Sequence, residues 1–240
     1  MFTKLSITLP DIRTQFRTKL PGGYYDYSDP VTKSENISLI KNINSRYGNL
    51  TSYWGQVFDI PNGVIIGFIA TESGGTMAPP NKYLATGLMQ VTPNALFECA
   101  RKWDAEVKIA PLPTQAVSLL KQKIPNFFTV SSVAPIQSKI LGYLKSDANF
   151  NIMAGTLVIR WLIEKFSYAL GSGQLNKAMV GYNAGPNREV LTSGGAKNPI
   201  DSLSLAINRR VPAESRAYLY KMLGKDGYLD LIYLQKLAVV

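Results

Sequence analysis

An apolar stretch that ends in one acid and two glycines constrains this sequence more than any other feature. Residues 61–90 read PNGVIIGFIATESGGTMAPPNKYLATGLMQ. Proline suits the first turn of a helix, and glycine commonly ends one. We therefore expect the apolar run from Val64 to Ala70 to lie in a helix that stops at Gly74-Gly75. That helix carries a single acid, Glu72, in its last turn.

The surroundings expected for Glu72 disfavour its charged form. It follows Ile69 by three residues and Phe68 by four, which places it on the same face of the helix. The negative end of the helix dipole adds to the effect of these apolar neighbours. A carboxyl group that holds its proton near neutral pH can serve as a general acid. A glutamate at a helix end is, however, more often an ordinary solvated residue.

Two later segments give Glu72 a context. The chain places Gly87-Leu88-Met89-Gln90 after Glu72-Ser73, and the sequence GYNAGP follows at 181–186. This succession resembles the lytic transglycosylases, which cleave bacterial peptidoglycan with a catalytic domain similar to goose-type lysozyme. The resemblance covers roughly residue 34 to the C-terminus.

The resemblance implies a role for each motif residue. Glu72 would be the catalytic acid and base, and the sugar's own 6-hydroxyl would be the nucleophile, so that a second carboxylate is not required. The residues implied to bind the substrate are Ser73, Met89, Gln90, Tyr182, Asn183 and Tyr218. Four of them are also explained by ordinary structure: Ser73 is a polar residue at a helix C-terminus, methionine is common in cores, and the two residues before Ala-Gly-Pro are common in turns. No cofactor and no metal is implied.

The sequence departs from the family pattern in two places. Arg209 stands near a position where many members carry a glutamate, which puts subsite preference and rate in doubt more than the type of reaction. Residues 104–146 make the separation between GLMQ and the next motif longer than the family leads us to expect. We interpret them as an inserted helical segment that either covers the core or lengthens a groove wall.

Composition excludes several other classes of function. The 240 residues contain no histidine and one cysteine, Cys99, which excludes Ser-His and Cys-His catalysis, histidine-ligated metals and an intrachain disulfide. The net charge of +10 suits an anionic partner, but the basic residues are dispersed and no specific nucleic acid is expected. Cys99 is expected to be a small buried residue.

The periodicity of apolar residues predicts a mainly α, lysozyme-like fold with little or no β-sheet. We expect residues 1–33 to form an irregular arm and residues 34–240 to form one domain. A first helix from Ser34 should end at Gly48-Asn49, and Thr92-Pro93 should begin another that reaches about Trp103. Further helices are expected at 147–166, at 174–182 and after Pro212.

The expected function is cleavage of the MurNAc–GlcNAc bond of peptidoglycan, with glycan strands as partner and 1,6-anhydro-MurNAc ends as product. One alternative is a hydrolytic muramidase on the same fold, and another is a non-catalytic glycan-binding or structural virion protein. The sequence shows no signal peptide and no transmembrane segment. We therefore expect a protein made in the cytoplasm that reaches the cell wall as a bacteriophage lysis or virion-associated protein.

Overall fold

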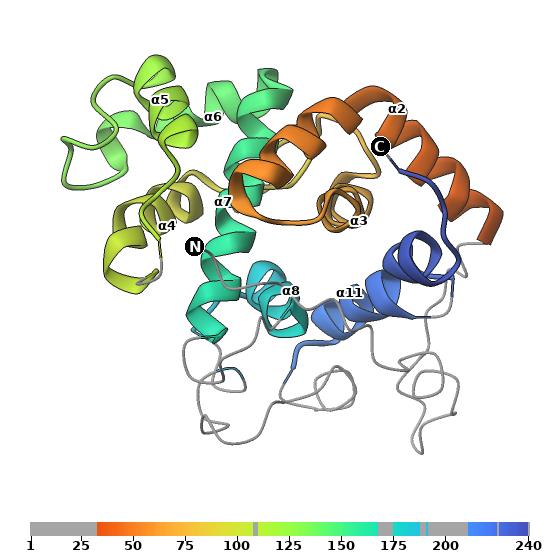
Figure 1. Ribbon diagram of the computed structural model, residues 1–240. Coiled ribbons are helices and arrows are strands. Elements are labelled where there is room, and N and C mark those ends of the chain that lie inside the picture. Colours follow the sequence, from red (N-terminus) through yellow and green to blue (C-terminus); the bar gives the residue numbers. More distant parts are fainter. Residues whose placement is uncertain are drawn as a thin grey trace. The chain divides into compact units, whose positions relative to one another are not determined.

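Helices make up nearly all of the regular structure in the computed structural model, which describes residues 33–107, 110–167, 175–187, 191, 211–224 and 226–239. Over those residues the prediction of a mainly α fold is confirmed, because the described part contains one isolated β-bridge, between Thr86 and Val91, and no sheet (Figure 1). The expected arm at 1–33 lies outside the described residues, apart from Lys33, as does Arg209. The elements are α2 (Lys33–Phe58), α3 (Asn62–Ser73), α4 (Pro93–Glu106), α5 (Thr114–Lys123), the 3₁₀-helix η1 (Ala134–Ile136), α6 (Gln137–Ser146), α7 (Ala148–Ser167), α8 (Leu175–Ala184), α11 (Ala213–Leu223) and the π-helix η2 (Asp230–Leu234).

The chain divides into two compact units. The first contains Ile43–Trp161, and the second contains residues 33–42 together with Leu162–Val239, so α2 and α7 contribute to both. None of the described helices is both long enough and apolar enough to cross a membrane.

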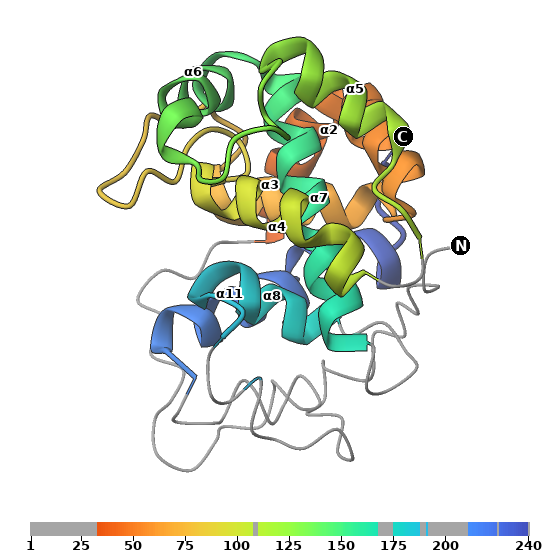
Figure 2. The ribbon, with the colours of Figure 1, turned by 90° about the vertical axis from the view of Figure 1, so that its left-hand side faces the viewer.

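Helix α3 forms the centre of the first unit. Every residue from Gly63 to Ala70 is buried, as expected for a helix that is apolar on all sides (Figures 1 and 2). Aromatic rings join α2 to α4, because the ring centroids of Phe58 on α2 and Trp103 on α4 lie 6.0 Å apart. Within α2, the Phe58 centroid lies 6.1 Å from that of Trp54. The α4 start was predicted correctly: Thr92 is the N-cap, and its hydroxyl oxygen accepts a hydrogen bond from the Ala95 N–H at 3.0 Å.

The predicted end of the first helix was wrong. Helix α2 continues through Gly48 for a further ten residues, to Phe58. The Thr51 hydroxyl stabilises the helix where it continues past Gly48, because it donates a hydrogen bond of 3.1 Å to the Gly48 carbonyl oxygen. Thr51 has no exposed surface. Burial of Trp54 and Phe58 outweighs the cost of about 1 kcal/mol that a glycine imposes within a helix.

Residues 104–146 are largely helical, as expected. They include α5, η1 and α6, whose apolar faces bury Ala116, Leu120 and Ile140. An ion pair of 2.8 Å joins Lys123 Nζ at the end of α5 to Asp147 Oδ2 at the start of α7. This segment is therefore fastened to the helix that follows it.

The second unit pairs α8 with α11, which lie side by side in both views (Figures 1 and 2). Its C-terminal turn is closed by Gln235, whose Nε2 donates to Asp226 Oδ1 at 2.7 Å and to Asp230 Oδ2 at 2.8 Å. Asn36 Nδ2 donates to the Asp226 carbonyl at 2.8 Å, so the start of α2 is tied to this turn.

Candidate functional site

Glu72 occupies the last turn of α3, as the sequence predicts. The helix ends at Gly74, which adopts the left-handed conformation (φ 60°) and donates its N–H to the Ala70 carbonyl at 3.3 Å. Glu72 is half-buried, while the eight residues from Gly63 to Ala70 are buried. The acid thus stands at the end of a buried helix, with part of its own surface exposed.

The turn after Glu72 is fixed by α2. Gly75 has φ 77°, and an added Cβ there would lie 2.7 Å from Ile43 Cγ1, so only glycine fits. Arg46 Nη1 donates to the Gly75 carbonyl at 3.2 Å, and its Nη2 donates to the Tyr47 hydroxyl at 2.8 Å. Sequence reasoning missed Arg46, because no local pattern relates it to a turn that lies 29 residues further along the chain.

The GLMQ segment is a tight turn and not a strand or helix. Thr86 and Val91 close it with two backbone hydrogen bonds of 3.1 and 3.2 Å. Gly87 (φ 79°) and Gln90 (φ 47°) supply the left-handed conformations that the turn needs, and Gln90 Nε2 donates to the Gly87 carbonyl at 2.9 Å. The Gly87 N–H donates to the Ala78 carbonyl at 2.8 Å, which attaches this turn to the loop that follows Glu72.

One buried side chain, Asn151 of α7, holds the GLMQ turn in place. Its Oδ1 accepts from the Met89 N–H at 2.9 Å, while its Nδ2 donates to the carbonyls of Thr86 and Leu144, each at 2.9 Å. Asn151 has no exposed surface. These contacts give Asn151 a structural role.

Met89 lies in the core and not on an exposed wall. It has no exposed surface, and an added Cβ on Gly155 of α7 would lie 2.4 Å from Met89 Sδ. The missing side chain of Gly155 therefore provides the space that Met89 fills. The expectation that Met89 lines a sugar groove has no support from its position in this unit, whereas Gln90 is partly exposed.

Ser73 is half-buried, and its hydroxyl donates back to the Ile69 carbonyl at 3.2 Å. The hydroxyl proton is thus engaged within the helix, and its oxygen can still accept a hydrogen bond. Substrate binding by Ser73 stays a prediction, restricted by this geometry to an accepting role.

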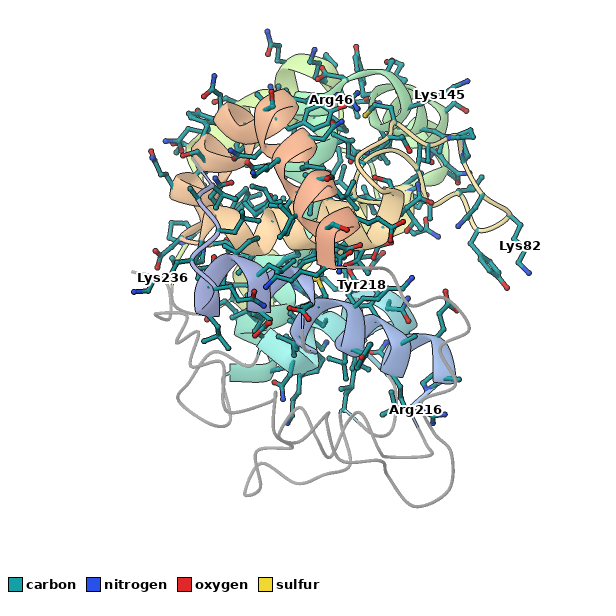
Figure 3. All side chains as sticks on the ribbon, turned by 90° about the vertical axis from the view of Figure 1, so that its right-hand side faces the viewer. Arg46, Lys82, Lys145, Arg216, Tyr218 and Lys236 are labelled. Atoms are coloured by element: carbon teal, nitrogen blue, oxygen red, sulfur yellow. The ribbon has the colours of Figure 1, made fainter. Side chains whose placement is uncertain are left out.

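The three remaining predicted residues belong to the second unit. Tyr182 and Asn183 are half-buried in the last turn of α8, and Tyr218 is buried on α11 (Figure 3). Asn183 Oδ1 accepts a 2.5 Å hydrogen bond from the hydroxyl of Ser215, which is fully buried on α11. Ser215 thus joins α8 and α11.

The structure therefore groups the predicted residues within their own units: Glu72, Ser73, Met89 and Gln90 in the first, and Tyr182, Asn183 and Tyr218 in the second. A scan against known protein-family models gave no match, and a search of curated proteins also gave none. The chemistry that the described site offers is that of one carboxyl group at the end of a rigid, buried helix.

Proposed function

We propose that this protein is a peptidoglycan lytic transglycosylase with Glu72 as its catalytic acid and base. The observation that carries the proposal is the placement of Glu72, which is half-buried at the end of a fully buried helix. Both chain segments that follow it are fixed, the glycine turn by Arg46 and the GLMQ turn by Asn151. Rigid support of this kind is what positions a catalytic group for proton transfer.

In the proposed reaction Glu72 donates a proton to the oxygen of the MurNAc–GlcNAc bond as that bond breaks. The carboxylate that remains then accepts a proton from the 6-hydroxyl of MurNAc, whose oxygen forms a bond to C1 and closes the 1,6-anhydro ring. The proton returns to the carboxyl group, and no water is consumed. The nucleophile comes from the substrate, so the mechanism needs no partner carboxylate.

Gln90 and the second-unit residues Tyr182, Asn183 and Tyr218 are proposed to bind the glycan strand. The hydrogen bond from Ser215 fixes the amide of Asn183, which leaves its Nδ2 group available to a sugar carbonyl. The cell wall is the proposed place of action, and delivery by a phage particle or lysis machinery stays a prediction. A hydrolytic muramidase with the same Glu72 is the alternative.

Replacement of Glu72 by glutamine tests the assignment. The amide cannot donate or accept the proton, so we expect lysis of purified peptidoglycan to fall by about 10²–10⁴-fold. Glu98→Gln is the matched control, because Glu98 is an exposed α4 residue whose Oε2 contacts Lys102 Nζ at 2.6 Å, and it should retain activity. Wild-type lysis by a folded Glu72→Gln protein would overturn the proposal.

A further inference from the structure

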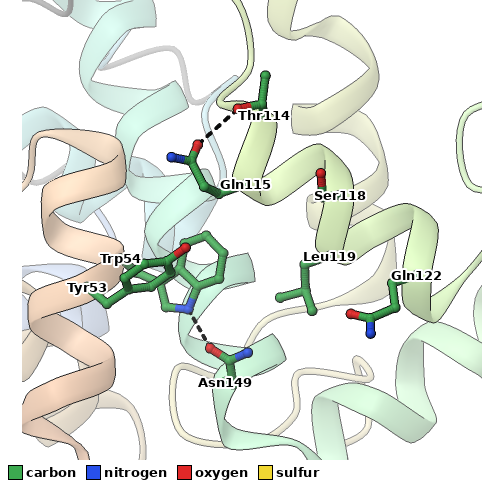
Figure 4. A pocket seen from close by; sticks show the side chains of 8 residues that line it. All are labelled: Tyr53, Trp54, Thr114, Gln115, Ser118, Leu119, Gln122 and Asn149. Carbon is green, nitrogen blue, oxygen red and sulfur yellow. Dashed lines mark hydrogen bonds between the residues drawn. The ribbon is translucent and has the colours of Figure 1, made fainter.

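A second feature of the first unit is a pocket between α2, α5 and α7. Its volume is about 560 Å³ (Figure 4). The side chains that carry the argument are Tyr53 and Trp54 of α2, Gln115, Ser118 and Gln122 of α5, and Asn149 of α7. None of the residues that line it carries a charge at neutral pH, although the whole chain has a net charge of +10.

The floor of the pocket is rigid. The Trp54 indole N–H donates to Asn149 Oδ1 at 2.7 Å, and the Tyr53 ring meets the Trp54 ring edge-on, with centroids 4.9 Å apart and planes at 76° (Figure 4). Trp54 is 2% exposed, whereas Tyr53 is 47% exposed. A large aromatic surface is therefore presented to solvent in a fixed orientation, next to a buried ring that supports it.

The opposite wall is rich in amides. Gln115 and Gln122 stand on α5 with Ser118 between them, and all three are exposed. An amide both donates and accepts hydrogen bonds, and a hydroxyl does the same. This wall complements a ligand that bears many hydroxyl and acetamido groups, and it offers no charge to attract phosphate or a metal ion.

The pocket lies on a different face of α7 from the GLMQ turn. Asn149 and Asn151 differ by two residues on α7, which places them about 200° apart around the helix. Asn151 holds the GLMQ turn, so Asn149 and the pocket lie near the opposite face of α7. A ligand in the pocket would consequently not occupy the position of the GLMQ turn.

We propose that this pocket binds an uncharged N-acetylated sugar of a glycan strand, with one face of the sugar on Tyr53 and its polar groups on Gln115 and Gln122. An aromatic ring suits the apolar C–H face of a pyranose, and amides suit its hydroxyl and acetamido groups. The choice of an N-acetylated sugar rests on the proposed function, while the existence and neutrality of the pocket do not. The pocket would hold a strand to the protein independently of cleavage.

The test uses the Trp54 indole as a local reporter. The chain contains three tryptophans, and protein labelled with ¹⁵N-tryptophan gives indole N–H signals that Trp54→Phe assigns. The Glu72→Gln protein is titrated with the tetrasaccharide of β-1,4-linked GlcNAc, which is then not cleaved by Glu72. We expect the Trp54 signal to move, and the signals of Trp103 and Trp161, which do not line the pocket, to stay in place.

Two pocket variants and one control complete the test. Tyr53→Ala and Gln115→Ala should each weaken the titration, the latter by about fivefold, the factor of one hydrogen bond of about 1 kcal/mol. Gln56→Ala removes an exposed glutamine of α2 that is outside the lining, and it should bind as the parent does.

A Trp54 signal that stays in place at millimolar tetrasaccharide would overturn the pocket proposal, and so would a response that Tyr53→Ala and Gln115→Ala leave unchanged. A Trp54 signal that moves with inorganic phosphate and not with the sugar would also contradict it. These outcomes are independent of Glu72 catalysis, because lysis by the Glu72→Gln protein decides that proposal separately.

Discussion

Substitution of Asn151 by alanine should destabilise the first unit more than any other polar-to-alanine change at the GLMQ turn. The amide makes three hydrogen bonds, with the Met89 N–H and with the carbonyls of Thr86 and Leu144. All three are buried and each is 2.9 Å long. The variant removes the whole set at once.

The expected loss of unfolding free energy follows from these contacts. Three hydrogen bonds at about 1 kcal/mol each give about 3 kcal/mol, and a backbone group left buried without a partner costs about 1–3 kcal/mol. Water can enter the space left by the amide and satisfy part of this demand. We therefore expect a loss of about 3–5 kcal/mol, a large fraction of the 5–15 kcal/mol typical of a domain.

Urea denaturation followed by circular dichroism measures this loss. With a slope of about 2–3 kcal/mol/M, the midpoint should fall by about 1–2.5 M. Asn94→Ala is the control, because Asn94 is exposed on α4 and its change should stay within about 0.5 kcal/mol. A loss below about 1 kcal/mol for Asn151→Ala would refute the claim that this amide holds the turn.

Two further predictions concern packing and pH. Gly155→Ala should lower the unfolding free energy by about 1–3 kcal/mol, because its Cβ would lie 2.4 Å from Met89 Sδ. Gly142→Ala, in an open position on α6, should raise the unfolding free energy by up to about 1 kcal/mol. Equal stability of the two variants in urea would contradict this prediction. Burial raises the pKa of Asp147, but the hydrogen bonds from Lys123 and from the Phe150 N–H lower it by more than burial raises it. The pKa of Asp147 therefore lies below its ordinary value. The ionised Asp147 carboxylate therefore stabilises the folded state above the ordinary pKa of aspartate, about 3.9. This contribution is lost as the pH falls through the lower pKa that Asp147 has in the folded state. The difference in Tm between the wild type and Asp147→Asn should thus be largest above about pH 5 and shrink towards pH 2, and a difference that is constant over this range would contradict the assignment.

Helix ends that depend on local chemistry could be predicted from the sequence. Gly74 ends α3 because glycine adopts the left-handed conformation without strain, and Thr92-Pro93 begins α4 because its hydroxyl caps the helix. The continuation of α2 past Gly48 could not be predicted, since it depends on Trp54 and Phe58 packing against distant helices. A helix that ends at Gly48-Asn49 does not include Tyr53 and Trp54, so the pocket that these two residues line could not be predicted either.

The candidate site was predictable in part. The proline at position 61 and the pair Gly74-Gly75 placed Glu72 at a helix end, and the structure has it there. The burial of Met89 depends on Gly155, which lies 66 positions away in the sequence. The hydrogen bonds of Asn151 to Met89 and Thr86 likewise span 62 and 65 positions. No local pattern encodes such contacts. For the same reason Arg46 and Ser215 became visible as positioning residues only in the structure.

The mass of the products released from peptidoglycan tests the central claim most directly. Purified peptidoglycan is digested in water enriched in ¹⁸O, and the muropeptides are analysed by mass spectrometry. If Glu72 directs the 6-hydroxyl of MurNAc to C1, the products end in 1,6-anhydro-MurNAc, are lighter by one water molecule than hydrolysed muropeptides, and carry no ¹⁸O. Products with reducing MurNAc ends that contain ¹⁸O would contradict the transglycosylase mechanism and establish hydrolysis in its place.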